Sequence, residues 1–165
     1  MTRRLALAIA AALVAAPCLP GGAVAVPRAG SSALPAAEAA VRACANEARR
    51  ARGLSPLRRN RVLDRAARLQ ARNLARFGFF DHVDPWGRGP VERVRLYDPA
   101  RTIGFPIGEN IAQGYRTASA ACRGWLRSPG HRANILAGGY TRIGAGVWRS
   151  SRGVPSYVQV FGVRR

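Results

Sequence analysis

Two histidines and one glutamate are the residues of this sequence whose types and spacing are best suited to chemistry. His82 lies in the motif FFDHVDP, His131 lies in SPGHRAN, and Glu109 lies between them in GENIA. The chain has only two histidines and eight acidic residues, and histidine both titrates near neutral pH and binds metals. The spacing therefore predicts that the three residues share one cleft, the alternative being that each histidine only completes a loop or packs in the core. Asp81 and Asp84 either orient the His82 ring as hydrogen-bond acceptors or only form a turn.

Two histidines and one glutamate match the ligand count of an open zinc site, in which water takes the fourth position. Ser128 and Pro129 predict the start of a helix that carries His131 in its first turn. The positive end of the helix dipole disfavours the protonated ring there, and a neutral imidazole is the form that binds metal or takes up a proton. Ser128 is interpreted as the cap of this helix and not as a nucleophile, because nothing around it marks a strained turn.

Hydrophobic periodicity predicts helices first and strands later. Asn60 is the expected cap of the second helix, and Gly53 and Gly78 are the expected left-handed stops. The expected helices run from Glu38 to Arg52, from Asn60 to Phe77, from Gly89 to about Tyr97, from a Thr117 cap, and from Ser128 to the Gly138-Gly139 pair. Strands are expected from Arg142 to Arg149 and from Ser156 to Val163, with Glu109 to Ala112 as a third candidate. This order indicates an α+β sandwich and not a wound parallel sheet.

The first 25 residues have the features of an export signal. Arg3 and Arg4 precede the apolar run 5–16, and Ala-Val-Ala at 23–25 fits a signal peptidase site. No later segment approaches the ~20 apolar residues of a transmembrane helix, so the mature protein is expected to be secreted, extracellular or periplasmic, and not an integral membrane protein. Residues 26–37 are predicted to be a flexible linker and residues 38–163 a single domain.

The chain is strongly basic. Its formal charge of +19 falls to +17 when Arg3 and Arg4 are removed, and all of its basic residues are arginines. Such a surface is expected to bind anionic envelope polymers through charge alone. No aromatic ladder or nucleic-acid motif accompanies the charge, so no specific nucleic acid is expected as a partner. The densest basic run comprises Arg49, Arg50, Arg52, Arg58, Arg59 and Arg61.

Removal of the signal peptide also removes Cys18 and leaves Cys44 and Cys122. Two cysteines in an exported protein favour one disulfide. Both also lie at apolar positions of expected helices, so two buried free thiols are the alternative.

Taken together, the motifs resemble the bacterial branch of the CAP superfamily. This superfamily is named after cysteine-rich secretory proteins, antigen 5 and pathogenesis-related proteins, and its domain is also called the SCP domain. The resemblance covers nearly all of residues 38–163 in order. It rests on Asn46-Glu47-x-Arg49, Leu57, Phe79-Phe80-Asp81-His82, Asp84-Pro85-x-Gly87, Gly108-Glu109-Asn110-Ile111-Ala112, Trp125-x-x-Ser128-Pro129-Gly130-His131-Arg132-Ala133-Asn134-Ile135-Leu136, Ile143-Gly144-x-Gly146 and Val158-Gln159-Val160-Phe161.

The resemblance implies a three-layer α-β-α sandwich with a central, mainly antiparallel sheet. It also implies a cleft lined by histidines and glutamates, which holds a divalent metal in some relatives. His82, Glu109 and His131 match the family's motif residues. The chain departs from the eukaryotic pattern at Ser128, where a second acid would stand, and it lacks the histidine of the eukaryotic Gly-His-x-Thr-Gln motif.

The favoured interpretation is a secreted CAP-domain protein that binds a ligand and is not an enzyme. Its cleft of His82, Glu109 and His131 has the ligands for a divalent metal such as zinc. Family members bind sterols, other lipids or protein partners, so an unidentified small molecule, lipid or protein is the expected ligand. One alternative is a metal-assisted, peptidase-like hydrolase in which the metal lowers the pKa of a bound water and Glu109 acts as ligand or base. The other is a cationic envelope-binding protein with a vestigial cleft.

Overall fold

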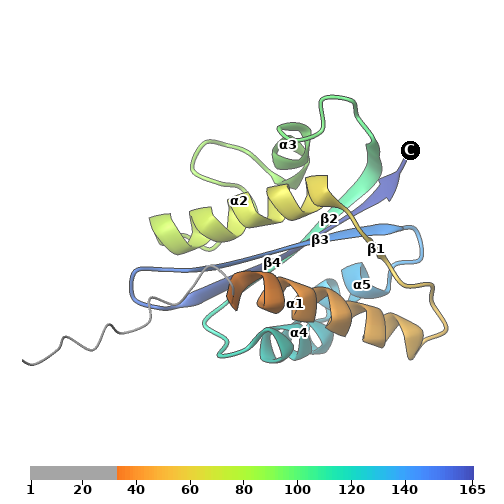
Figure 1. Cartoon of the computed structure of the whole chain (residues 1–165), viewed down its shortest axis with the longest axis horizontal. Coiled ribbons are helices and arrows are strands. Elements are labelled where there is room, and N and C mark those ends of the chain that lie inside the picture. Colours follow the sequence, from red (N-terminus) through yellow and green to blue (C-terminus); the bar gives the residue numbers. More distant parts are fainter. Residues whose placement is uncertain (1–32) are drawn as a thin grey trace, which may run out of the picture.

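A four-stranded sheet separates two groups of helices in the computed structural model, which describes residues 33–165 (Figure 1). Helices α2 and α3 cover one face of the sheet, and α1, α4 and α5 cover the other. The predicted α+β class and the three-layer α-β-α sandwich are therefore confirmed. The elements are α1 (Ala33–Arg50), β1 (Arg58–Arg59), α2 (Arg61–Phe77), α3 (Pro90–Arg95), β2 (Ile103–Gln113), α4 (Ala118–Arg127), α5 (Pro129–Leu136), β3 (Arg142–Arg149) and β4 (Pro155–Arg164).

The strands follow the order β1-β3-β4-β2, with only β1 and β3 parallel, so β2 is an edge strand of a mainly antiparallel sheet. Glu109 of β2 pairs with Val160, whose side chain belongs to the core under α2 and α3. The next residue, Asn110, pairs with Gln159, which donates a 3.2 Å hydrogen bond to the Val41 carbonyl of α1. Because side chains alternate along a strand, Glu109 and Asn110 face opposite helical layers.

Two glycines of β3 bring α2 into direct contact with the sheet. A Cβ atom at Gly144 would lie 2.1 Å from the carbonyl carbon of Leu63, and one at Gly146 would lie 2.3 Å from that of Ala67. Any side chain at either position would push the helix away, since real Cβ atoms never approach backbone so closely. These glycines therefore fix the position of α2, from which the loop carrying His82 departs.

The caps predicted for α2 are confirmed. The Asn60 side-chain oxygen accepts hydrogen bonds from the N–H groups of Val62 at 2.8 Å and Leu63 at 3.1 Å. Gly78 ends the helix with φ of +70°, and its N–H donates to the Leu74 carbonyl at 3.3 Å. The sequence therefore defines both ends of this helix.

The first helix begins earlier than predicted. Residues 33–37, which were assigned to the linker, belong to α1, because Leu34 and Ala37 pack against the core beside the sheet. Pro35 lies in the first turn, where its missing N–H removes no helical hydrogen bond. The predicted signal peptide, residues 1–25, and residues 26–32 lie outside the described residues. Within residues 33–165, no helix is long and apolar enough to cross a bilayer.

Strand β2 is also longer than predicted, because it begins at Ile103 and not at Glu109. Its first half contains Pro106, and the pairing with β4 shifts between Gly104 and Gly108. Glycine and proline interrupt the alternation of apolar residues by which a strand is recognised in sequence, so the first half of β2 was not predicted.

The predicted disulfide between Cys44 and Cys122 is confirmed. It joins α1 to α4, with Cα atoms 6.3 Å apart and a sequence separation of 78 residues. Helix α4 begins at the predicted Thr117 cap, whose hydroxyl accepts the Ala120 N–H at 3.1 Å. The bridge therefore ties the first helix to the helix that leads into α5.

Candidate functional site

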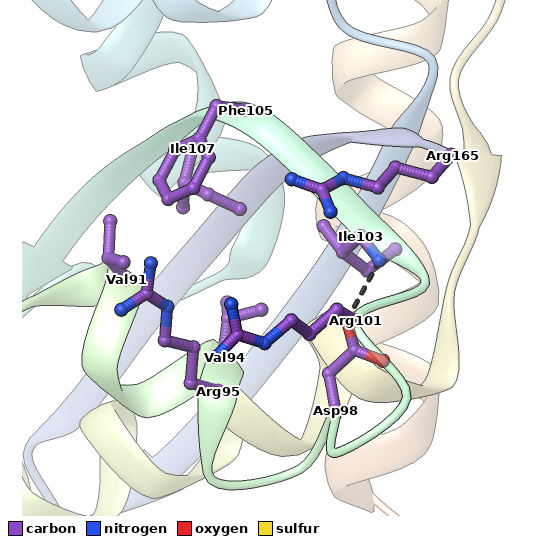
Figure 2. Close-up of a pocket in the computed structure, with 9 residues that line it drawn as sticks. All are labelled: Val91, Val94, Arg95, Asp98, Arg101, Ile103, Phe105, Ile107 and Arg165. Atoms are coloured by element: carbon purple, nitrogen blue, oxygen red, sulfur yellow. Dashed lines mark hydrogen bonds between the residues drawn. The ribbon is translucent and has the colours of Figure 1, made fainter.

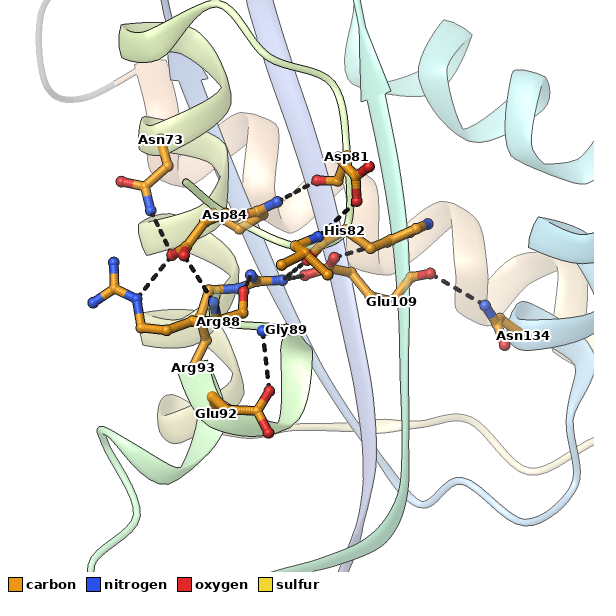
Figure 3. A network of polar contacts seen from close by, with 12 residues as sticks. Asn73, Asp81, His82, Asp84, Arg88, Gly89, Glu92, Arg93, Glu109 and Asn134 are labelled. Atoms are coloured by element: carbon orange, nitrogen blue, oxygen red, sulfur yellow. Dashed lines mark hydrogen bonds and ion pairs between the residues drawn. The ribbon is translucent and has the colours of Figure 1, made fainter. Parts of the chain in front are cut away.

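The candidate site lies at the edge of β2, where the loop after α2 meets the strand (Figure 3). The Glu109 side chain is only 1% exposed, whereas the His82 side chain is 47% exposed. His82 Nδ1 lies 2.9 Å from Glu109 Oε1. The structure therefore brings these two predicted site residues into direct contact, with the carboxylate inside and the imidazole at the surface.

Arg93 of α3 is a third member of this contact that the sequence analysis missed. Its side chain is fully buried, and its Nη2 donates to Glu109 Oε2 at 2.8 Å and to the His82 carbonyl at 2.9 Å. Arg93 Nη1 also donates to the Arg88 carbonyl. The arginine thus fixes both the Glu109 carboxylate and the backbone of the loop. One arginine among so many carried no distinguishing signal in the sequence.

The two histidines have pKa values shifted in opposite directions. The hydrogen bond to Glu109 raises the pKa of His82, and this effect exceeds the opposing effect of burial. Burial lowers the pKa of His131, and the nearby charge of His82 lowers it further. The protonated form is therefore more favoured at His82, and less favoured at His131, than in a free imidazole. A shift of His131 towards the neutral form was predicted from the helix dipole, but the causes of the lowered pKa are burial and the charge of His82.

The role of Ser128 differs from the predicted one. It occupies the N-cap position of α5, and its carbonyl accepts the Arg132 N–H at 2.9 Å, but its side chain makes no capping hydrogen bond. Its hydroxyl instead lies 2.8 Å from His131 Nδ1. The interpretation of the side chain as a cap is therefore corrected, since the hydroxyl holds the histidine ring.

Two asparagines connect α5 to β2. Asn110 Nδ2 donates to the His131 carbonyl and to Gln159 Oε1, each at 3.1 Å. Asn134 Nδ2 donates to the Glu109 carbonyl at 3.2 Å and to Asn110 Oδ1 at 3.0 Å. The backbone of His131, and not its ring, is thus tied to the strand that carries Glu109. The motifs GENIA and SPGHRAN each supply one of these asparagines.

Asp81 and Asp84 form the turn and do not orient the site histidine. Asp84 Oδ1 accepts the N–H groups of Trp86 at 3.1 Å and Arg88 at 3.0 Å, and its Oδ2 accepts Arg88 Nε at 2.9 Å. Asp81 Oδ1 accepts the Val83 N–H at 2.8 Å. Of the two interpretations left open by the sequence, the turn is the one that these contacts support.

As arranged, these residues do not fit a divalent metal. In the part of the chain that the structure describes, no three His, Cys, Asp or Glu side chains are placed to hold one. Both oxygens of Glu109 already have partners, and the buried Arg93 cation on one of them would repel a second cation. Among residues 33–165, the buried donor Arg93 Nε has no acceptor, and a metal ion would not supply one. Zinc at His82, Glu109 and His131 stays a prediction, and it requires Glu109 to release a partner.

Comparisons with known proteins relate this arrangement to one family. Residues 43–161 match the cysteine-rich secretory protein family, CAP. The uncharacterized protein YkwD of Bacillus subtilis (strain 168) is 33% identical over 101 residues, which are 61% of this chain and 38% of YkwD. An extracellular protein containing an SCP domain from Bacillus anthracis aligns with a TM-score of 0.71 and 26% identity over 79% of this chain and 41% of that protein. An outer surface protein of Borrelia burgdorferi shares the fold, with a TM-score of 0.68, 22% identity, and coverage of 76% of this chain and 90% of that protein.

Proposed function

The chain belongs to the cysteine-rich secretory protein family, and we propose that it is a secreted ligand-binding module whose site is the β2 edge around His82, Glu109 and His131. The features of an export signal in residues 1–25 support secretion, as does the disulfide, since such bonds persist in oxidising compartments. The relative from Bacillus anthracis is described as extracellular. This chain spans about two fifths of that relative and of YkwD.

The observation that carries the proposal is that three large apolar side chains within residues 80–86, on the His82 loop, are exposed. Phe80 is 57% exposed, Val83 is 50% exposed and Trp86 is 55% exposed. The loop is anchored from inside, because Arg93 holds its backbone and Glu109 holds its histidine ring. Exposed apolar side chains on an anchored loop are typical of binding surfaces. The favoured ligand has an apolar part for these side chains and a hydrogen-bond acceptor for the imidazole of His82.

A binding function is favoured over a catalytic one, because Glu109, the acid of the site, already has a partner on each oxygen. Glu109 is held between a cation and an imidazole, so it is not available as a general base. The neutral His131 contacts Ser128, but the proposal assigns no nucleophile role to that serine. The alternative, a metal-assisted hydrolase, requires bound metal. Metal analysis of protein purified without a histidine tag separates it from the binding module.

Charge supports a second candidate, a cationic envelope-binding protein. Five of the eight acidic residues are buried, which leaves the outer surface more positive than the composition suggests. Arg49 does not contribute to this surface, because it is only 2% exposed and its guanidinium donates to the carbonyls of Ser55, Ile135 and Ala137. Electrostatic adhesion is therefore expected in addition to ligand binding at the site. High salt should abolish the adhesion and leave the ligand binding.

The test uses three probes: phosphatidylglycerol vesicles, phosphatidylcholine vesicles and purified peptidoglycan. Co-sedimentation is measured in about 0.5 M NaCl, where a Debye length of about 4 Å suppresses adhesion through charge alone. We expect at least one probe to retain the wild-type protein and the Trp148→Ser variant, since Trp148 is an exposed residue of β3 outside the loop. We expect the Phe80→Ser/Trp86→Ser variant to stay in the supernatant and not to co-sediment with that probe. If the protein co-sediments only at low salt and the loop variant behaves like wild type, the ligand-binding proposal is rejected. The second candidate, a cationic envelope-binding protein, then remains.

A further inference from the structure

A hollow of about 660 Å³, partly open to solvent, lies between the loop that joins α1 to β1 and the loop that joins α5 to β3. This volume is within the range of small-molecule sites, about 300–1,000 Å³. The hollow between α3 and the first half of β2 is lined by three arginines but holds only about 30 Å³, which is room for water and not for a ligand (Figure 2). The larger hollow is therefore the candidate for a site apart from the His82 loop.

Arg49 of α1 lines this hollow as a buried cation that lacks an acidic partner. The structure describes two buried arginines, Arg49 and Arg93, and Arg93 pairs with Glu109. Arg49 is 2% exposed and donates only to three backbone carbonyls, and within residues 33–165 its Nη2 has no acceptor. Burial lowers the pKa of Arg49, and no described carboxylate opposes this effect. A buried charge is costly unless an opposite charge compensates it, and a bound anion would supply that charge.

Two further arginines of the hollow lie side by side on neighbouring strands. Arg58 of β1 and Arg142 of β3 are paired residues of two parallel strands, so their side chains leave the sheet on the same face. In the described part of the chain, neither guanidinium forms a salt bridge. Like charges at directly neighbouring positions of a sheet are destabilising. An anion bound between the two side chains would replace this repulsion by attraction.

The other polar side chains that line the hollow are neutral. They are the hydroxyl-bearing residues Ser55, Tyr140 and Thr141, and no acidic residue among residues 33–165 lines it. The Thr141 hydroxyl accepts the Arg164 N–H at 3.2 Å and keeps its own proton for donation. The hollow thus combines three positive charges with neutral hydroxyl groups. This balance selects a ligand that is an anion and that also carries polar groups.

We propose that this hollow binds a small phosphate monoester of the size of a sugar phosphate, held by Arg49, Arg58 and Arg142. The phosphate of a monoester carries about two negative charges near neutral pH and has three strong acceptor oxygens, one for each arginine. Guanidinium groups match phosphate oxygens in geometry and in charge. The volume of the hollow leaves room for the organic part of the ester beside Ser55 and Thr141. The proposal does not depend on the function assigned to the His82 loop.

The test is titration calorimetry of the full chain with glucose 6-phosphate in about 0.15 M NaCl, where a Debye length of about 8 Å limits adhesion through the general surface charge. Inorganic phosphate supplies the anion alone, and glucose supplies the uncharged body. The variant is Arg58→Gln/Arg142→Gln. It should fold, because β1 pairs through its backbone, with the Arg58 N–H donating to the Thr141 carbonyl at 3.1 Å. The matched control is Arg95→Gln/Arg101→Gln, the same loss of charge at the smaller hollow.

We expect saturable binding of glucose 6-phosphate, with amide shifts in NMR spectra at Ser55 and Thr141 and not at the His82 loop. The Arg58→Gln/Arg142→Gln variant should raise the Kd about tenfold or more, since a hydrogen bond to a charged group is worth at least that factor. The control should leave the Kd within about twofold, since its arginines lie at the other hollow. Without ligand, the variant should be at least as stable as wild type, because it removes a repulsive pair.

The proposal is overturned if glucose 6-phosphate does not saturate, or if the variant and the control weaken its binding equally, because general surface charge would then be responsible. Equal affinity for inorganic phosphate would make the hollow a simple anion site. Equal affinity for glucose would show that the arginines do not select the ligand. Either of these results also rejects the phosphate monoester.

Discussion

The buried charge pair between Arg93 and Glu109 predicts a large effect of Glu109→Gln on stability. The change keeps the size and shape of the side chain, so it creates no cavity. It leaves the guanidinium of Arg93, which is fully buried, without a compensating charge. Removing one partner of a buried ion pair costs about 3–5 kcal/mol. Since native domains are stable by only about 5–15 kcal/mol, we expect the variant to lose about a fifth or more of its free energy of unfolding.

The measurement is urea unfolding followed by far-ultraviolet circular dichroism. Glu47→Gln is the matched control, because it removes the same charge at an exposed position of α1 and should change stability by less than about 0.5 kcal/mol. Arg93→Met completes a double-mutant cycle, in which the double variant should be more stable than the two separate losses predict, by about 1.5 kcal/mol or more. A Glu109→Gln variant within about 1 kcal/mol of wild type would refute the reasoning, since Arg93 would then be stable without its partner.

Three further predictions follow from the disulfide, the histidines and the surface charge. Loss of the bridge in Cys44→Ser/Cys122→Ser should lower the free energy of unfolding by about 4.5 kcal/mol. This is the entropic cost of closing a loop of 78 residues in the unfolded chain, and an unchanged denaturation midpoint would contradict it. Proton NMR should find the His82 pKa above and the His131 pKa below the usual value near 6.5. The stability that His82 contributes should be complete below that value and be lost as pH rises through the raised pKa, so the difference between wild type and His82→Gln should shrink with rising pH. Replacing exposed arginines by glutamine should weaken heparin, lipopolysaccharide and DNA binding alike, and retention of one polymer in about 1 M salt would show specific recognition instead. The exposed arginines to replace are Arg50, Arg52, Arg58 and Arg61.

The sequence predicted the parts of the fold that depend on local chemistry. Asn60 and Gly78 define α2 because a capping side chain and a left-handed residue act on their own neighbours. The start of β2 depends instead on pairing with β4 across the register shift at Gly104 and Gly108, which local alternation does not contain. Strand β1 has two residues and exists only through its pairing with β3, so no periodicity could reveal it.

The same distinction applies to the candidate site. His82 and Glu109 were identified by their scarcity and their motifs, and the structure places them in contact. Arg93 was not identified, because its role depends on the packing of α3 against β2, which buries it beside Glu109. Ser128 was assigned by its position at a helix start, which is correct for the backbone, but the hydroxyl has a second possible partner one turn away in His131. Sequence spacing does not decide between those two partners.

Burial of the acidic residues connects the stability of the fold to the character of its surface. Glu38, Asp64 and Glu109 each lie inside and each pair with arginine. Every such pair places an anion in the interior and leaves other arginines outside without one, so the interactions that hold the layers together also make the exterior positive. We therefore expect adhesion to anionic polymers whether or not a ligand binds. Specific recognition requires groups whose geometry is fixed, and the proposed site offers the imidazole of His82, held by Glu109, and the apolar side chains of the same loop. Binding that survives high salt is for this reason the property that distinguishes the site from the surface.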